Sequence, residues 1–384
     1  MRIAILSRNP KLYSTRRLRE ACTQRGHQVD VMDTGRFSMF LERKKPSLLY
    51  DDKPPADYDA IIPRIGASIT FYGTAVVRQF EQMGVFSLNS AQAIRFTRDK
   101  LHATQILSRH NVGIPVTAFV RDKKAVLSVV DRLGGGPLVI KVLEGTQGVG
   151  VILAENRRTA KAIIETLQSA KQNVLIQQFV KESKGQDLRA FVVGDRVVAA
   201  MRRKAAEGEF RSNVHQGGAV EAVELDADYQ AAAVQVAQIL NLNVAGVDML
   251  ESKSGPLILE VNASPGLEGI EQATGKDVAG EIIGYIEDRI FFPEIDIRQR
   301  LTLKSGYGVV EILVYENSSI AHKQVQASGL RGQDILVLTI SRGSISIPNP
   351  KGSREILPGD TLLCFGRVET LKALVPHKRK KPDA

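Results

Sequence analysis

Two apolar runs separated by a short polar turn make up the sequence VAGVDMLESKSGPLILEVN at residues 244–262. The runs predict two strands, and the turn SKSG between them predicts a hairpin. Because side chains alternate in direction along a strand, Glu260 and Asn262 share one face, and the hairpin folds Asp248 back beside Glu260. Three oxygen ligands of this kind suit Mg²⁺, which keeps its other positions for water and substrate phosphate. The alternative is a solvated polar face, but polar groups inside so apolar a hairpin would lack partners.

A second candidate site lies upstream, where the predicted strand 137–142 leads into the glycine-rich sequence EGTQGVG at residues 144–150. Glycines let backbone N–H groups approach phosphate oxygens closely, and Lys141 supplies a positive charge. The sequence lacks the Gly-Lys-Ser/Thr that a Walker loop needs after its glycines. It does not match the dinucleotide fingerprint either, because this loop runs from strand to strand rather than into a helix. For the loop taken alone, an ordinary glycine-rich hairpin is the alternative.

A basic stretch, MRRK at residues 201–204, ends another predicted strand and precedes FRSNVHQGG at residues 210–218. Alternation places Arg203 on the face opposite Arg202 and Lys204, so at least one cation is expected to point into the site. A planar guanidinium makes charge-assisted hydrogen bonds to phosphate or carboxylate. The alternative is a solvated charged loop.

The rest of the chain divides into regions by its pattern. Strands and helices alternate at the start, which predicts an open α/β layer with a parallel sheet. A charged helical stretch between Ile94 and His110 leads to a second region that is dominated by strands, an α+β pattern. After Phe-Phe-Pro at 291–293, short strands with Gly and Pro turns predict a third domain. The expected divisions are residues 1–95, 96–290 and 300–376, with a basic tail at 377–384.

Composition limits the classes of function. The 384-residue chain has 52 Lys and Arg against 42 Asp and Glu, a net charge of +10, which suggests an anionic partner without identifying it. No apolar run approaches the roughly 18 residues of a membrane span, so a cytoplasmic protein is expected. The absence of Trp and the 5% aromatic content argue against a base-stacking nucleic-acid binder. Cys22 and Cys364 fit neither a disulfide framework nor a metal site.

The order of these motifs resembles the RimK family of ATP-grasp ligases, whose best-known member adds glutamates to the C-terminus of a small-subunit ribosomal protein. The likeness covers nearly all of residues 1 to about 290, and it implies an N-terminal pre-ATP-grasp α/β domain followed by a two-lobed ATP-grasp domain. The segments that carry it are IAILSR at 3–8, IPRIG at 62–66, RDK at 98–100, Lys141 with EGTQG at 144–148, QDLR at 186–189, FRSN at 210–213, Asp248, and EVNASPGLEG at 260–269.

The resemblance also implies an ATP site with bound metal. Lys100 and Lys141 would meet the phosphates, Gln178 and Phe179 would lie at the adenine hinge, and Asp187 would lie near the ribose. The family pattern has an acidic residue where this chain has Gln178. The full set implied to bind the nucleotide is Lys100, Lys141, Glu144, Gly145, Gly148, Gln178, Phe179, Asp187, Arg211, Ser212 and Asn213. The residues that match the Mg²⁺ or Mn²⁺ ligands, for two ions, are Asp248, Glu260 and Asn262.

The chemistry of such a site is that of a ligase. A carboxylate is a poor acyl donor, so ATP first converts it to an acylphosphate, and the amine of an amino acid then displaces phosphate. Arg203, with Arg189 as second candidate, would stabilise the acylphosphate or the oxyanion formed on attack. A covalent protein nucleophile is not needed.

The C-terminal residues 308–366 resemble the TrkA-C domain, the ligand-sensing module of potassium-transport regulators. This resemblance implies a small α+β regulatory domain, a small-molecule effector bound there, and a homo-oligomer. A passive β-rich appendage is the alternative.

We expect an ATP-dependent amino-acid ligase that adds L-glutamate to the C-terminus of a ribosomal or other acidic protein or peptide, without membrane contact or direct nucleic-acid readout. One alternative keeps the ligase and changes the acceptor to a small metabolite or an amino-group carrier. Another is a non-catalytic nucleotide sensor that regulates ion transport. The three metal ligands and two phosphate lysines argue against the sensor.

Overall fold

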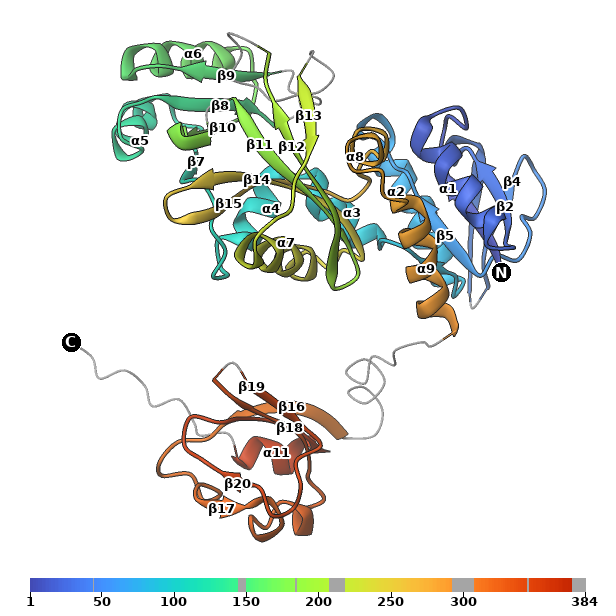
Figure 1. Cartoon of the computed structure of the whole chain (residues 1–384), viewed down its shortest axis with the longest axis vertical. Coiled ribbons are helices and arrows are strands. Elements are labelled where there is room, and N and C mark those ends of the chain that lie inside the picture. The colour runs from blue at the N-terminus through green and yellow to red at the C-terminus, as the bar shows by residue number, and fades with distance from the viewer. Residues whose placement is uncertain are drawn as a thin grey trace. The chain divides into compact units, whose positions relative to one another are not determined.

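The computed structural model of the chain describes residues 1–43, 45–143, 150–183, 185–206, 218–291, 307–343 and 345–374. The chain forms two compact units, residues 1–292 and residues 293–384 (Figure 1). Within the described ranges, no helix is long and apolar enough to cross a membrane.

The first unit begins with a parallel sheet, as the alternating strand and helix pattern predicts. Its buried strands β1 and β5 are apolar, whereas the helices bury one face each. The chain leaves β1 toward β2 and leaves β5 toward β6, so the connections after these two central strands run to opposite sides. In spatial order the strands are β2 (Gln28–Met32), β1 (Arg2–Leu6), β5 (Ala60–Pro63) and β6 (Phe86–Ser87), and the helices that follow β1 and β5 are α1 (Tyr13–Gln24) and α2 (Thr70–Gln82).

A hairpin that the pattern does not predict joins this layer. Its strands are β3 (Phe37–Glu42) and β4 (Lys45–Tyr50), which pair in an antiparallel register. It buries Phe37 and Leu48 in one cluster with Phe80 of α2. A charged turn and a proline, Pro46, obscure the strand pattern in the sequence.

The helical stretch predicted between Ile94 and His110 is confirmed, and the structure divides it into two helices. They are α3 (Ala91–Arg98) and α4 (Lys100–Leu107). Asp99 separates them: its backbone is extended, and its carboxylate accepts a hydrogen bond from the N–H of His102 at 2.9 Å. This cap starts the second helix at Lys100.

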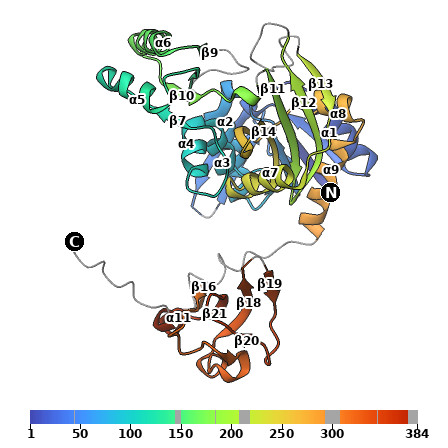
Figure 2. The ribbon, with the colours of Figure 1, turned by 60° about the vertical axis from the view of Figure 1, so that its left-hand side comes forward.

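Two antiparallel sheets follow in the first unit. The smaller one is covered on one face by α5 (Val126–Arg132) and α6 (Arg157–Ser169), which bury Leu138, Ile140 and Ile176. Figures 1 and 2 show these helices at the opposite end of the unit from α9. In spatial order the strands of this sheet are β7 (Thr117–Phe119), β10 (Val174–Gln178), β8 (Leu138–Val142) and β9 (Val151–Ala154).

The larger sheet has two unlike faces. Leu188, Ala190 and Val192 of β11 pack with α7 (Ala227–Ile239) on one face. On the other face, Phe191 and Val193 join a cluster with α8 (Glu268–Thr274) and α9 (Val278–Phe291), and α9 packs against α1. In spatial order the strands are β13 (Ala219–Ala222), β12 (Arg196–Lys204), β11 (Gln186–Val193), β14 (Val244–Ser252) and β15 (Gly255–Asn262).

The second unit is a small α+β structure around its own buried cluster. Asp360 is fully buried in the turn that ends LPGD, where its carboxylate accepts hydrogen bonds from Arg342 and from the N–H of Leu357. Its elements are a sheet of β16 (Tyr307–Leu313), β21 (Thr361–Arg367), β18 (Leu336–Arg342) and β19 (Ile345–Pro348), a pair of β17 (Lys323–Gln324) and β20 (Glu355–Ile356), and helix α11 (Val368–Leu374).

Candidate active site

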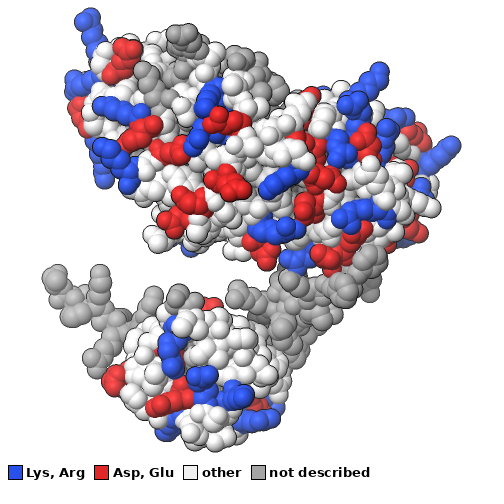
Figure 3. All heavy atoms as spheres, viewed as in Figure 1, with Lys and Arg blue, Asp and Glu red and all other residues white. Residues whose placement is uncertain are grey.

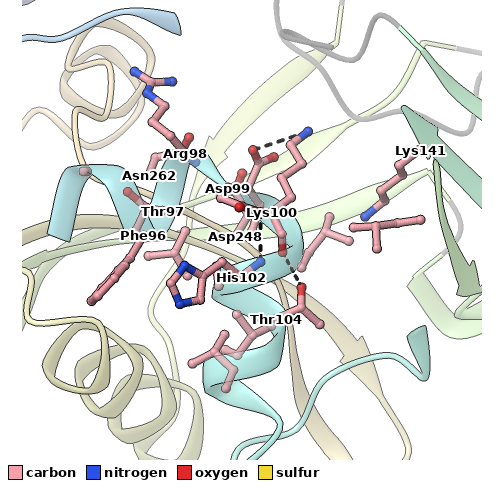
Figure 4. Close-up of a pocket in the computed structure, with 18 of the residues that line it drawn as sticks. Phe96, Thr97, Arg98, Asp99, Lys100, His102, Thr104, Lys141, Asp248 and Asn262 are labelled. Atoms are coloured by element: carbon pink, nitrogen blue, oxygen red, sulfur yellow. Dashed lines mark hydrogen bonds and ion pairs between the residues drawn. The ribbon is translucent and has the colours of Figure 1, made fainter. Parts of the chain in front are cut away.

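A pocket lies between the two antiparallel sheets and beside α3 and α4 (Figure 4). It collects all of the sequence-predicted site residues that the structure describes: Lys100, Lys141, Gln178, Phe179, Asp187, Arg189, Arg203, Asp248, Glu260 and Asn262. The other predicted nucleotide contacts, Glu144, Gly145, Gly148, Arg211, Ser212 and Asn213, lie outside the described residues.

The hairpin of β14 and β15 places its polar side chains as the sequence predicts. Asp248 pairs directly with Glu260, and Gly246 pairs with Asn262. Strict alternation would, however, put Ile258 on the same face as Glu260, whereas it pairs with Met249 and joins the buried cluster under α7. A register shift next to Asp248 leaves Leu259 as an extra residue, and this bulge turns Glu260 toward the pocket.

Asp248 is buried, with 3% of its surface exposed, and two arginines hold it. Arg189 donates to both carboxylate oxygens at 2.6 and 2.7 Å, and Nη2 of Arg203 lies 2.9 Å from Oδ2. Burial raises the pKa of Asp248, but the two guanidinium groups outweigh burial and the pKa is lowered. The carboxylate is therefore ionised near neutral pH.

Oxygen donors of the predicted metal site fit a hard divalent cation. Asp248, Glu260 and Asn262 present carboxylate and amide oxygens on one face of adjacent strands. The arginines take three of the about four lone-pair directions of the Asp248 carboxylate, which leaves one for a metal ion. No group of three or more His, Cys, Asp or Glu that could hold a metal occurs among the described residues, so Asn262 is needed to complete this set.

The turn after Asn262 approaches β14 closely. A Cβ at Gly246 would lie 2.8 Å from Cβ of Pro265, so this strand position requires glycine. Pro265 and its neighbours Ser264 and Gly266 line the pocket. The close approach therefore fixes the pocket wall next to Asn262.

Arg203 confirms the prediction that a cation of the basic strand points into the pocket. It is 6% exposed, and it donates to both oxygens of Asp187 at 2.6 and 2.7 Å. Arg202 on the opposite face forms an ion pair with Glu251 at 2.9 Å instead. Because Asp187 is engaged by Arg203, its predicted position near the ribose stays a prediction.

Two lysines enter the pocket from different elements (Figure 4). Nζ of Lys100, at the start of α4, lies 3.7 Å from Oε1 of Glu260. Lys141, on β8, donates from Nζ to Oε1 of Gln177 at 2.7 Å. Sequence analysis missed Gln177, although alternation with the buried Val174 and Ile176 of β10 places it on the pocket face.

The predicted hinge residues end β10. Backbone N–H groups of Gln178 and Phe179 donate to the carbonyl oxygens of Val116 and Pro137 at 2.9 and 3.2 Å. The side chain of Gln178 is exposed, so the structure gives it no buried partner within the described residues. Its role at the adenine ring stays a prediction.

We expect ATP affinity to fall as pH rises through the pKa of Lys141. Burial lowers this pKa to about 8, with a smaller contribution from Lys100, while Glu260 and Asp248 oppose the change. Above that pH the free lysine is neutral, and phosphate binding must take up a proton, so the Kd for ATP rises by up to about tenfold per pH unit. Calorimetric titration across this range measures the slope. Lys141→Arg keeps its charge and should bind with a flat pH profile; an equal slope in this variant would contradict the assignment.

Comparison with known proteins identifies relatives of the whole chain. Models of the RimK PreATP-grasp domain, the RimK-like ATP-grasp domain and the TrkA-C domain match residues 1–94, 97–286 and 309–377. A probable alpha-L-glutamate ligase of Rhodopirellula baltica is 58% identical over 381 residues, which span 99% of this chain and 94% of that protein. The chain belongs to the RimK family of ATP-grasp ligases.

Two further relatives extend this finding for the RimK-family chain. Probable alpha-L-glutamate ligase 1 of Hahella chejuensis is 56% identical over 289 residues, 75% of this chain and 95% of that protein. The solved structure of the ATP-grasp ligase PsnB complexed with a phosphomimetic variant of minimal precursor, Mg and ADP is 21% identical. It covers 75% of this chain and 98% of its own length with a TM-score of 0.60, and so shares the fold.

These findings confirm the predicted ATP-grasp architecture with a pre-ATP-grasp domain and a TrkA-C domain. The RimK-family chain is an ATP-dependent carboxylate–amine ligase. Membership in an enzyme family argues against the non-catalytic sensor.

Proposed function

We propose that this ligase adds L-glutamate to the C-terminal carboxylate of an acidic protein or peptide, a small-subunit ribosomal protein being one candidate. The observation that carries the proposal is the 58% identity to a probable alpha-L-glutamate ligase across 99% of the chain. The pocket supports it chemically, because two lysines and two arginines converge on a site that must hold phosphates and carboxylates.

The lysine and arginine side chains of the pocket have different roles in the reaction. Lys100 and Lys141 bind the phosphates of ATP, the first from α4 and the second from β8. Arg203, held by Asp187, stabilises negative charge on the reacting acyl group, and Arg189 is the second candidate for that role. Asp248, Glu260 and Asn262 would hold a divalent ion, which would neutralise phosphate charge.

The proposed reaction has two steps. An oxygen of the acceptor carboxylate attacks the γ-phosphorus of ATP, the bond to the bridging oxygen breaks, and ADP leaves with an acylphosphate formed. The amine nitrogen of glutamate then attacks the acyl carbon, phosphate leaves with the bonding electrons, and the nitrogen loses a proton. The products are ADP, phosphate and an acceptor longer by one residue.

A screen of amino acids tests the proposal. The full-length enzyme, ATP and Mg²⁺ are incubated with each amino acid, with and without ribosomal proteins or tetraglutamate, and products are weighed by mass spectrometry. We expect a ladder of added glutamates, with yield falling as salt rises, because charge attraction is screened over about 10 Å at 0.1 M salt. A single addition, or a product on a small metabolite, would favour the alternative acceptor class.

The second unit should be dispensable for chemistry. We expect a chain that ends at residue 292 to fold and to retain acceptor-dependent ATP turnover, because the described site residues all lie in the first unit. The Hahella relative supports this expectation, since 289 aligned residues span 95% of its length and leave no room for a second unit. Turnover and light scattering measure activity and oligomer size, and we expect the cut to reduce the oligomer.

A second cut provides the control for this experiment. Ending the chain at Lys276 also removes α9, whose Ile282, Ile283 and Ile286 are buried in the core, so this protein should not fold. A folded chain of residues 1–292 without turnover would show that the second unit completes the active site. The proposed regulatory role, with an effector bound there, would then be dropped.

A further inference from the structure

The carboxyl edge of the N-terminal sheet is the point at which its chain connections diverge. β1 and β5 are neighbours, and the chain leaves them toward opposite sides of the sheet. In open α/β sheets, ligands bind outside the carboxyl ends of the strands at such a switch point. Arg64 follows β5 directly, and Arg8 lies two residues beyond β1.

Arg64 has a positive charge that no carboxylate of the described residues pairs with. It is half-buried, and neither an ion pair nor a hydrogen bond involves its guanidinium among the described residues. Burial and the neighbouring Arg98 lower its pKa to about 10, and neither cause is a carboxylate. A desolvated guanidinium with no partner is costly, so an anion brought by a ligand would be bound strongly there.

Arg98 ends α3 and holds its guanidinium beside the loop that follows β5. Its Nη2 donates to the carbonyl oxygen of Ile65, the residue after Arg64. In Figure 4 the side chain of Arg98 points away from Lys100 and Lys141. Arg98 therefore lies on the pocket wall and faces the sheet edge rather than the phosphate lysines.

Arg8 completes the cluster from the other strand. Its Nη1 lies 3.3 Å from Oγ of Ser68, which joins the loop after β1 to the loop after β5. Arg8 is exposed, so its guanidinium can reach a ligand at this edge. The arginines at this edge differ from the face of the first unit drawn in Figure 3, where basic side chains lie among acidic ones.

The arginine edge adjoins the metal end of the pocket. Oγ of Ser264 donates to the carbonyl oxygen of Pro63 at 3.3 Å, and Pro63 directly precedes Arg64. Ser264 lies two residues after Asn262, and both line the pocket. The backbone that carries Arg64 is therefore held next to the metal end of the pocket.

We propose that Arg64, flanked by Arg98 and Arg8, binds a non-reacting carboxylate of the substrate and so selects acidic residues. This inference rests on the proposed function and names its specificity site. Two groups could supply the carboxylate: the side chain of the incoming glutamate, or the side chains at the end of the acceptor chain. A guanidinium binds either through two parallel N–H···O hydrogen bonds.

Binding gives the first test, because it does not need turnover. Calorimetry measures the affinity of tetraglutamate, tetraglutamine and glutamate for the full-length protein with ADP and Mg²⁺. We expect Arg64→Gln to raise the Kd of at least one acidic probe by about tenfold or more, while the affinity for ADP stays unchanged. Arg19→Gln removes one exposed charge from α1 and should bind all probes as wild type does.

Steady-state kinetics then distinguishes the two sources of the carboxylate. If the incoming amino acid uses Arg64, the variant loses its preference for glutamate over glutamine, with a raised KM for glutamate. If the acceptor uses it, the preference for tetraglutamate over tetraglutamine is lost instead. Equal losses for acidic and amide probes, or no change in either, would overturn the proposal.

The outcomes separate this inference from the proposed function. Arg64-dependent tetraglutamate binding without glutamate ligation would leave the site standing and remove the proposed function. Glutamate ligation with an unaffected Arg64→Gln variant would leave the proposed function standing and remove the specificity site at Arg64. Should Arg64→Gln not fold, Arg64→Lys keeps the charge without the planar fork, and it should raise the KM for the acidic probe. Unchanged kinetics in Arg64→Lys would then overturn the proposal.

Discussion

Glu260→Ala should reduce metal-dependent ATP turnover to less than about one tenth of wild type at saturating Mg²⁺, because a lost direct ligand costs several kcal/mol of charge stabilisation. The fold should survive, since the Glu260 side chain is 41% exposed and its ion-pair partner, Lys100, is 3.7 Å away. ADP release under saturating substrates measures the loss. Melting temperature and metal-free ATP binding, both expected to stay near wild type, show that the site remains assembled.

A carboxylate on the same hairpin serves as the matched control. Glu251 lies on β14, is 43% exposed and forms an ion pair with Arg202 away from the pocket. Glu251→Ala should therefore retain wild-type turnover. More than a tenth of wild-type activity in Glu260→Ala would count against the metal assignment.

Arg203→Met should lower both stability and turnover strongly. The substitution leaves the buried carboxylates of Asp187 and Asp248, 5% and 3% exposed, with one guanidinium fewer. Breaking a buried ion pair by removing one partner costs about 3–5 kcal/mol of unfolding free energy. Loss of a positioned donor to the reacting group should reduce turnover by about 100-fold or more.

The stability loss has a defined pH dependence. In the wild type the pKa of Asp248 is lowered in the folded state, so its ion pairs stabilise the fold above the unfolded pKa, and this contribution is lost as pH falls through the folded pKa. In Arg203→Met the Asp248 carboxylate keeps only Arg189 as a cationic partner and can protonate at higher pH, which relieves part of the penalty. The difference from wild type should therefore shrink on acidification.

Denaturant unfolding at several pH values measures this difference. Arg202→Met is the control, because Arg202 is the adjacent residue of β12 and pairs with surface carboxylates. Its loss should cost about 1 kcal/mol or less. Equal destabilisation by both variants would show that the buried ion pairs with Asp187 and Asp248 contribute no more to stability than the surface ion pairs of Arg202.

Local sequence patterns predict those parts of the site whose geometry depends on one strand face or one turn. The hairpin that joins Asp248 to Glu260 follows from two apolar runs and a polar turn, and Arg203 follows from alternation along β12. The bulge at Leu259 could not be predicted, because both registers keep the hairpin apolar and only packing against α7 selects one. The break at Asp99 was detectable as a capping residue inside a helical stretch.

Other parts depend on contacts between distant segments. The hydrogen bond from Lys141 to Gln177 joins β8 and β10. No local sequence pattern shows that these two strands pair. Arg8, Arg64 and Arg98 come together only through the parallel pairing of β1 with β5 and the contact of Arg98 with Ile65. Each of them looks like an ordinary surface arginine in the sequence.

Oxygen transfer from acceptor to phosphate tests most directly that this pocket activates a carboxylate. Tetraglutamate and glutamate, each with oxygen-18 in both oxygens of the α-carboxylate that can be activated, are incubated with the enzyme, ATP and Mg²⁺, and the mass of the released phosphate is measured. An acylphosphate requires one labelled oxygen in phosphate for every amide bond formed. Amide formation with unlabelled phosphate would contradict the account.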